Sequence, residues 1–202
     1  LYFFVIIVAN AISIGTVALV SRATGAGDFA KALAVARQSL LFGAAVSVAL
    51  SLIGLTLSRE IVWAAGFPPE IRAIADTFLR IFAVALGANY LLLISNALFR
   101  ASGEVTKPLI TMFFVTAMNV AADFALVFGF GPIPPLGYSG IAVATAVSVI
   151  FGMAINLALF SRTRWRAVYG GRWILLPATI RQIFRLGWPA AGLVRALGWA
   201  LA

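Results

Sequence analysis

The sequence predicts an all-α, polytopic membrane helix bundle with five complete transmembrane helices and a truncated sixth. Three observations predict this fold class. The 202 residues are 63% hydrophobic and only 10% charged, whereas soluble domains are near half apolar and a quarter charged. Several long intervals of the chain carry no charge, and their length is near the roughly 20 residues that a helix needs to cross a bilayer. Lys and Arg also concentrate in alternate loops, as they do in membrane proteins.

The charge-free intervals place the individual helices. A Pro-rich break at 129–137 separates the fourth helix from the fifth, because Pro lacks the amide donor that a helix needs. Buried helices of a soluble protein would carry polar faces, which these intervals largely lack. The chain opens on Leu1 and stops in an apolar run at Ala202, so we expect a piece of a longer protein. In chain order the helices are predicted at 1–20, 38–58, 79–99, 108–130 and 139–161, with a truncated one from Trp188.

The loop charges predict the orientation. The first, third and fifth loops carry eleven Lys and Arg residues, and the other two loops carry three. Because cytoplasmic loops collect Lys and Arg, loops 22–37, 100–107 and 162–187 are predicted to be cytoplasmic. We therefore expect a multi-pass protein of a bacterial or archaeal plasma membrane, in which the first helix runs from outside to inside.

Several classes of protein are excluded by residue content. The chain has no Cys and no His, so thiolate or imidazole metal sites and hydrolase triads cannot be assembled. No nucleotide-binding motif is present, so we expect no enzyme and no cofactor. The net charge of +9 resembles that of a nucleic-acid binder. Since the charge lies in membrane loops, we expect membrane lipids as partners and no nucleic acid.

The basic segment 162–187 is predicted to be a linker along the membrane surface. Trp165, Trp173 and Trp188 suit the membrane–water interface, and the Arg residues suit anionic headgroups. The apolar residues Ile180, Ile183, Phe184 and Gly187 fall on one side, with Arg181 and Arg185 beside them. This spacing predicts a short amphipathic helix on the inner leaflet, before the truncated helix of 188–202.

Asp123 is the one acidic residue inside a predicted span. A central Asp costs about 2.5–3.5 kcal/mol on insertion scales, and such a residue usually binds a cation, carries a proton or lines an aqueous cavity. The alternative is an Asp near a helix end that reaches interfacial water, since Asp123 lies roughly 22 Å along the helix from Pro108. We favour a functional role.

The neighbourhood of Asp123 strengthens this interpretation. Asn119 lies one turn earlier and Thr116 two turns earlier, on the same face. A carboxylate among amide and hydroxyl oxygens suits Na⁺ or a protonatable switch, so Asp123 and Asn119 are candidate Na⁺ ligands. For Asn89 and Ser148 alone we favour ordinary interhelical hydrogen bonds.

Five motifs resemble the multidrug and toxic compound extrusion (MATE) transporters, in the order and with the loop sidedness of that family. The first two are loops, and the others lie in or at the start of helices. They are Ser21-Arg-Ala-Thr-Gly-Ala-Gly-Asp28, Leu98-Phe-Arg-Ala-Ser-Gly-Glu-Val-Thr-Lys-Pro108, Asn119-Val-Ala-Ala-Asp123 with Phe128-Gly129, Gly140-Ile-Ala-Val-Ala-Thr145, and Leu186-Gly-Trp-Pro189. They are similar to the family's helix-two-to-three loop, "LRGxGDTKTP" loop, "NxxxD…FG" helix, "GAALAT" helix and "LGxP" entry.

The resemblance implies helices two to six of a twelve-helix transporter, plus the start of helix seven. Residues 1–161 would be the N-terminal lobe, 162–187 the linker between lobes and 188–202 the first helix of the C-terminal lobe. Such proteins export cationic or amphipathic drugs in exchange for H⁺ or Na⁺ by alternating access. In the DinF-like prokaryotic branch, the motifs carry the cation site onto Asp123, Asn119, Asn96 and Thr145.

Two features depart from the family pattern, and two other functions stay open. The loop at 129–137 is longer and richer in Pro than usual, and Arg195 stands in the truncated helix with no assigned role. A lipid-linked oligosaccharide flippase of the same superfamily would share the helix pattern, but should have Arg residues in its cavity, and the five complete spans have none. A non-transporting membrane scaffold is the other alternative, and it would not need Asp123.

Overall fold

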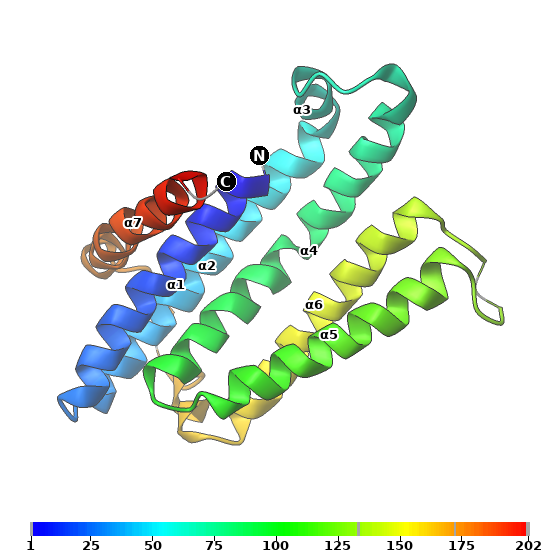
Figure 1. The fold of residues 1–202 in the computed structure, drawn as a ribbon. Coiled ribbons are helices and arrows are strands. Elements are labelled where there is room, and N and C mark those ends of the chain that lie inside the picture. The colour runs from blue at the N-terminus through cyan, green and yellow to red at the C-terminus, as the bar shows by residue number, and fades with distance from the viewer. Residues whose placement is uncertain (1, 133, 172, 201–202) are drawn as a thin grey trace. The chain divides into compact units, whose positions relative to one another are not determined.

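The computed structural model describes residues 2–132, 134–171 and 173–200, and its side chains are described between Val5 and Pro189 (Figure 1). These residues form seven α-helices and one short 3₁₀ helix. Their order is α1 (Tyr2–Gly25), α2 (Phe29–Thr56), α3 (Ser58–Ala64), α4 (Pro69–Ala101), α5 (Thr106–Val127), α6 (Tyr138–Ser161), η1 (Arg164–Val168) and α7 (Pro177–Ala200).

Five of these helices are long and apolar enough to cross a membrane, which confirms the predicted all-α membrane fold. Their ends differ from the charge-free intervals. Helix α2 begins at Phe29 and includes Lys31 and Arg37, and α4 begins at Pro69, ten residues before the predicted start. Charged side chains with straight stems are good helix formers, so a helix continues past the membrane boundary that its charges mark.

The two predicted outer loops have different structures. The first contains α3, a two-turn helix that the sequence analysis took as loop. The second connects α5 to α6 and is non-helical over its described residues, 128–132 and 134–137, as its Pro residues predicted. Gly129 and Gly137 both have positive φ there, at 82° and 55°, a conformation that favours glycine because it has no Cβ. These turns reverse the chain between two antiparallel helices.

The predicted boundary at Trp188 falls inside a single helix. Helix α7 runs without interruption from Pro177, eleven residues before the predicted start of the truncated helix, and Pro189 lies within it. An interior Pro removes one backbone hydrogen bond, a loss that neighbouring helices and local adjustments can accommodate. The amphipathic segment and the truncated helix are therefore one element. Arg195 lies outside the residues whose side chains are described.

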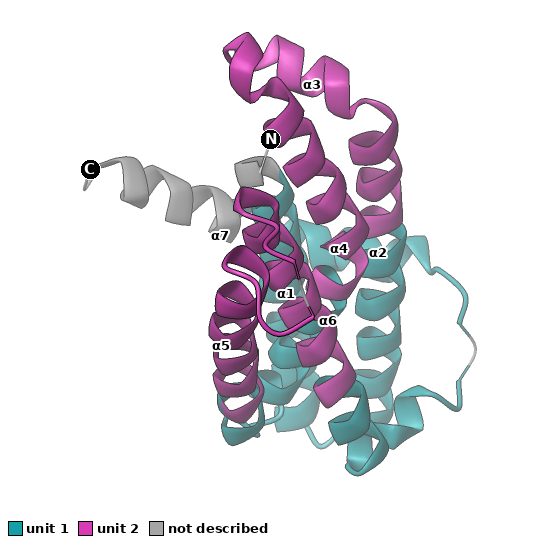
Figure 2. Ribbon diagram, turned by 90° about the vertical axis from the view of Figure 1, so that its right-hand side faces the viewer, with its two compact units in different colours: residues 1–45, 90–109, 156–202 teal, residues 46–89, 110–155 magenta. Residues whose placement is uncertain are grey.

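The chain comprises two compact units (Figure 2). In unit 1, which comprises residues 1–45, 90–109 and 156–202, hydroxyl groups connect the helices. The Thr16 hydroxyl donates to Ser39 Oγ at 2.8 Å, between α1 and α2. The Tyr90 hydroxyl donates to the Val5 carbonyl oxygen at 2.7 Å, between α4 and α1. Polar side chains at these crossings are satisfied inside the protein, as an apolar environment requires.

Unit 2 comprises residues 46–89 and 110–155, and small residues hold its helices close. A Cβ on Gly54 would lie 2.9 Å from the Ala83 Cβ, between α2 and α4. The Ser51 hydroxyl donates to the Ala83 carbonyl oxygen at 2.5 Å at the same crossing. Between α6 and α5, a Cβ on Gly140 would lie 2.8 Å from the Leu126 carbonyl oxygen. Small residues at such contacts let helix backbones approach, as is typical of membrane helices.

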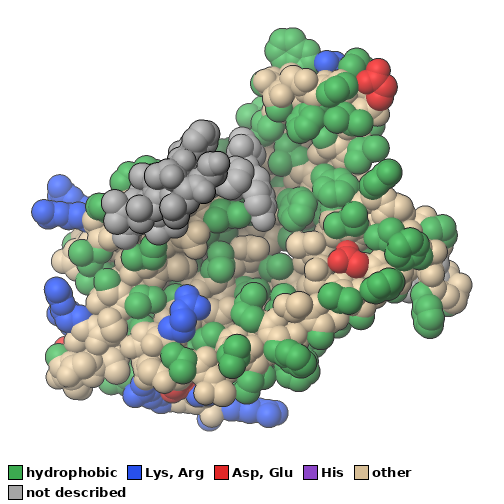
Figure 3. Space-filling view, viewed as in Figure 1, with side chains coloured by type: hydrophobic (Ala, Val, Ile, Leu, Met, Phe, Trp, Pro, Cys, Tyr) green, Lys and Arg blue, Asp and Glu red, His purple; other side chains and the backbone are tan. Residues whose placement is uncertain are grey.

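The linker after α6 is docked on unit 1 by a buried tryptophan. Trp165 in η1 is fully buried, with ring centroids 5.5 Å from Phe29 and 6.1 Å from Phe160. Beside it, Arg164 pairs with Glu104 at 3.6 Å and lies 5.1 Å from the Phe29 ring centroid. Lys and Arg gather around this end of the molecule, at the lower edge of Figure 3. We call residues 162–171 and 173–176 the docked linker.

Two residues of α2 hold the rest of the docked linker by its backbone. Arg37 donates to the carbonyl oxygens of Ala167 and Val168 at 2.8 and 2.9 Å, where η1 ends. Gln38 donates to the Ile174 carbonyl oxygen and accepts from the Leu176 amide, both at 2.7 Å. This pairing mimics one rung of a β-ladder. The linker that the sequence analysis placed on the lipid surface is therefore fixed to protein as well.

Candidate functional site

The Asp123 carboxylate lies in the last turns of α5, four residues before the helix ends at Val127. Its residue is half-buried, and its Oδ1 atom is buried with no hydrogen-bond partner among the described residues. One turn earlier, Asn119 is also half-buried, and its Nδ2 atom is likewise buried and unpartnered. Unpaired buried polar atoms are rare and need an explanation such as a bound ion. Two such atoms on one face of α5 indicate a candidate ion-binding position.

Thr145 lies on α6 close to the height of Asp123. Helices α5 and α6 are antiparallel and touch where Gly140 meets Leu126. Counting along both helices from this contact places Thr145 and Asp123 within about 3 Å of the same level. The Thr145 hydroxyl donates to the Ile141 carbonyl oxygen of its own helix at 3.0 Å, which leaves its lone pairs available as acceptors.

Asn96 belongs to unit 1, and the structure gives it a partner that the sequence analysis did not consider. The Asn156 amide of α6 donates to Asn96 Oδ1 at 2.9 Å and to Ser95 Oγ at 2.7 Å. Asn96 and Asn156 are 3% and 1% exposed. The three side chains form a buried polar clamp between α4 and α6. Asn156 is the single Asn of the predicted helix 139–161, a signal that could have identified it.

The other polar residues of the predicted spans fall into ordinary roles. The Ser148 hydroxyl is buried and donates to the Ala144 carbonyl oxygen at 2.6 Å, within its own helix. This differs from the interhelical bond that the sequence analysis favoured, because a Ser hydroxyl reaches the carbonyl one turn back more easily than another helix. Thr116 is exposed, so it does not share the burial of Asn119 and Asp123.

Substitution Asn156→Ala is expected to lower the free energy of unfolding by about 1–2 kcal/mol, since it removes two hydrogen bonds between membrane helices. The measurement is unfolding of the full-length protein by a titrated denaturing detergent. The matched control is Asn10→Ala, because Asn10 is an exposed Asn on α1. Equal losses in both variants would contradict a stabilising role for the clamp.

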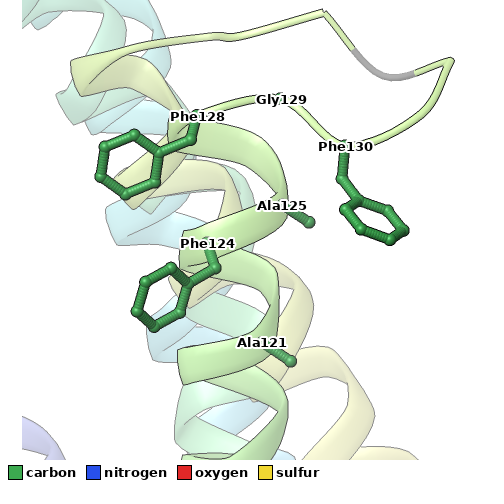
Figure 4. Close-up of a pocket in the computed structure, with 6 residues that line it drawn as sticks. All are labelled: Ala121, Phe124, Ala125, Phe128, Gly129 and Phe130. Atoms are coloured by element: carbon green, nitrogen blue, oxygen red, sulfur yellow. The ribbon is translucent and has the colours of Figure 1, made fainter.

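An apolar depression of about 620 Å³ lies at the end of α5 that bears Asp123 (Figure 4). Phe124 lies in the last turn of α5 and Phe128 just beyond its end, with ring centroids 6.1 Å apart, and Phe130 lies across from them on the following loop. Ala121, Ala125 and Gly129 complete the lining, which includes no polar side chain. An exposed aromatic surface of this kind fits lipid chains and has no group that would orient a polar ligand.

Comparison with known proteins gives a consistent set of similarities. The MatE family model matches residues 1–125. A probable multidrug resistance protein NorM of Pseudomonas putida is 31% identical over 186 residues, covering 89% of this chain and 39% of that protein. The multidrug export protein MepA of Staphylococcus aureus is 28% identical, covering 76% of this chain and 33% of its own length. The chain thus spans about two fifths or less of these curated relatives.

Solved structures show the same fold. An inward-facing multidrug resistance MATE transporter of the MOP superfamily superposes with a TM-score of 0.83 at 19% identity, covering 94% of this chain and 43% of that one. A MOP superfamily transporter from Pyrococcus furiosus, described as having a binding pocket of reverse polarity, superposes with a TM-score of 0.78 at 20% identity. At these identities the likeness concerns the fold.

Proposed function

We propose that this chain, which belongs to the MatE family, is part of a multidrug efflux transporter that exchanges cationic or amphipathic drugs for H⁺ or Na⁺. Its relatives are multidrug transporters, and its five apolar helices make it a multi-pass membrane protein. We place it in the plasma membrane. Transport by alternating access needs two conformations whose balance the coupling ion shifts, and no catalytic step.

The unpartnered Asp123 carboxylate oxygen is the observation that carries the proposed coupling. Because this oxygen is buried, solvent stabilises its charge poorly, so a proton or Na⁺ would relieve a real cost. Asn119, one turn away, has the amide oxygen that a hard cation accepts as a ligand. We assign Asp123 the role of loading the ion, with Asn119 beside it.

Thr145 and Asn96 are the further proposed oxygen donors. Thr145 is supported by its level on the neighbouring helix and by its free lone pairs. Asn96 belongs to unit 1, where its Oδ1 accepts a hydrogen bond from Asn156, so its proposed role rests on the motif resemblance alone. Occupancy of Asp123, Asn119 and Thr145 would then alter the packing of α5 against α6, and so bias the equilibrium between inward and outward states.

Ethidium efflux from vesicles that contain the full-length transporter tests this function. We expect efflux to accelerate when an inward gradient of Na⁺ or of H⁺ is imposed, and to stop when the matching ionophore dissipates that gradient. Vesicles without the protein are the control. Efflux that ignores both gradients would contradict ion coupling, and the absence of any efflux would favour the scaffold alternative.

A further inference from the structure

Helix α7 packs against α1 in backbone contact. A Cβ on Gly15 would overlap the Ile183 carbonyl oxygen, and a Cβ on Gly187 would overlap the Ala11 carbonyl oxygen. The two contacts are one turn apart on each helix and run in opposite chain directions, so the helices are antiparallel (Figure 1). Ile183 is fully buried at this crossing. Glycine at both contacts permits the close approach.

This crossing carries the middle of α7 below the membrane surface, because Ile183 lies about 9 Å along the helix from its start at Pro177. Arg22 marks the end of the charge-free part of α1. Gly15 is seven residues from Arg22 and Ala11 is eleven, or about 10 and 16 Å along the helix. The hydrocarbon core is about 30 Å thick, so both contacts lie within it. The segment of α7 between Ile183 and Gly187 therefore lies at a depth where charged groups are costly.

The face of α7 opposite α1 nevertheless carries two Arg side chains. Arg181 and Arg185 are one turn apart and exposed, and helical spacing puts them on the side away from Ile183 and Gly187. No carboxylate of the described residues pairs with either guanidinium. Arg181 can extend toward the membrane surface, because side chains tilt toward the helix N-terminus. Arg185 lies deeper, where an Arg at a lipid-facing position costs several kcal/mol.

An aromatic pair lies beside the two guanidinium groups. Phe184 and Trp188 are also one turn apart, and their rings are stacked at a centroid distance of 5.1 Å and an interplanar angle of 21°. Both side chains are exposed, at 37% and 44%. The exposed face of α7 thus presents two parallel rows, one aromatic and one cationic. We call these four residues the α7 aromatic–arginine face.

We infer that the exposed α7 aromatic–arginine face binds the anionic group of an aromatic, amphipathic substrate. This inference rests on the proposed transport function and narrows its substrate class. Side chains one turn apart on a helix are about 5–6 Å from each other, so Arg181 and Arg185 can grip one carboxylate, sulfonate or phosphate with their planar donors. The aromatic body of the substrate would pack on Phe184 and Trp188.

Binding of 8-anilinonaphthalene-1-sulfonate, a fluorescent aromatic anion, tests the inference on the full-length transporter in nanodiscs of neutral lipid. The double substitution Arg181→Gln with Arg185→Gln should weaken binding about tenfold or more. The control is Arg162→Gln with Arg166→Gln, which removes the same charge from exposed residues of the docked linker. An equal loss in the control would overturn the inference, because it would show general charge attraction.

Further measurements separate binding at this face from misfolding of the variant and from binding of lipid headgroups. If the double variant does not fold, Arg185→Gln alone should weaken binding at least threefold, and no change would overturn the inference. Phosphatidylglycerol added to the nanodiscs should not displace the probe; full displacement would assign the face to lipid headgroups and also overturn it. Gradient-driven ethidium efflux by the parent protein reports the proposed function separately. If the parent protein shows that efflux and the double variant still binds the probe as tightly as the parent does, the anion site is refuted and the proposed function stands.

Discussion

Substitution Asp123→Asn is expected to abolish ion-coupled efflux by the full-length transporter while leaving the protein folded. The amide has the shape of the carboxylate but neither its charge nor its proton, so it cannot load H⁺ and should bind Na⁺ far more weakly. Loss of an interaction with a charged group, at about 3 kcal/mol, corresponds to roughly a hundredfold in affinity. The measurement is gradient-driven ethidium efflux from vesicles.

The control for this prediction is Asp76→Asn. Asp76 is an acidic residue on α4 that pairs with Arg80 at 3.1 Å, so its substitution removes the same charge from a different role. We expect Asp76→Asn to keep its efflux, because such partly exposed pairs contribute little. The thermal stability of Asp123→Asn should equal or exceed that of the parent protein, since the substitution removes a buried charge without a partner. Undiminished coupled efflux in Asp123→Asn would refute the site.

Substitution Trp165→Ala is expected to lower the free energy of unfolding of the full-length protein by about 3–5 kcal/mol, the usual cost of emptying a site filled by a large aromatic side chain. Trp165 is fully buried against Phe29 and Phe160, so the cavity would open under the docked linker. The measurement is thermal or detergent-induced unfolding of the purified protein.

A second measurement reports the linker itself. The described chain has no Cys, so Val168→Cys would introduce a single thiol there at a fully buried position. We expect this thiol to react slowly with a maleimide, and at least tenfold faster when Trp165→Ala is added. Trp173→Ala is the matched control, because Trp173 is 42% exposed and should change neither stability nor labelling. Slow labelling in the Trp165→Ala protein would show that the linker does not depend on this anchor.

The structure differs from the sequence-based expectation at α7 and at the docked linker, and both differences have the same cause. Sequence periodicity predicted an amphipathic helix around 180–187. Ile183 and Gly187 are buried on its apolar side, whereas Phe184, which the same pattern placed on that side, is 37% exposed. Periodicity could not show that this side meets α1 and not lipid, because both environments are apolar. In the same way, Arg37 reads as a cytoplasmic charge, yet it donates to carbonyl oxygens of residues 130 and 131 positions away. The local sequence around Arg37 does not indicate a partner so far away in the chain.

For the same reason, the sequence predicted only part of the candidate site. Asp123 and Asn119 lie one turn apart on one helix, so the helical repeat alone placed them together. Asn96 was assigned through the family resemblance, and its observed partner, Asn156, lies 60 residues away on α6. Whether Asn96 contacts Asn156 or another amide depends on the rotation of each helix about its axis. The hydrophobic content of a helix does not determine that rotation.

The sequence by itself determined the solvent and the coarse architecture of this protein. An apolar excess in charge-free runs of about 20 residues fits only a membrane, because the cost of transferring charges and free backbone groups into lipid is large and local. The tertiary structure decided where each helix ends, which polar groups pair, and which face of α7 stays open. Those choices depend on packing between residues far apart in the chain, where a missing Cβ at Gly15 or Gly187 allows a contact that hydropathy cannot reveal.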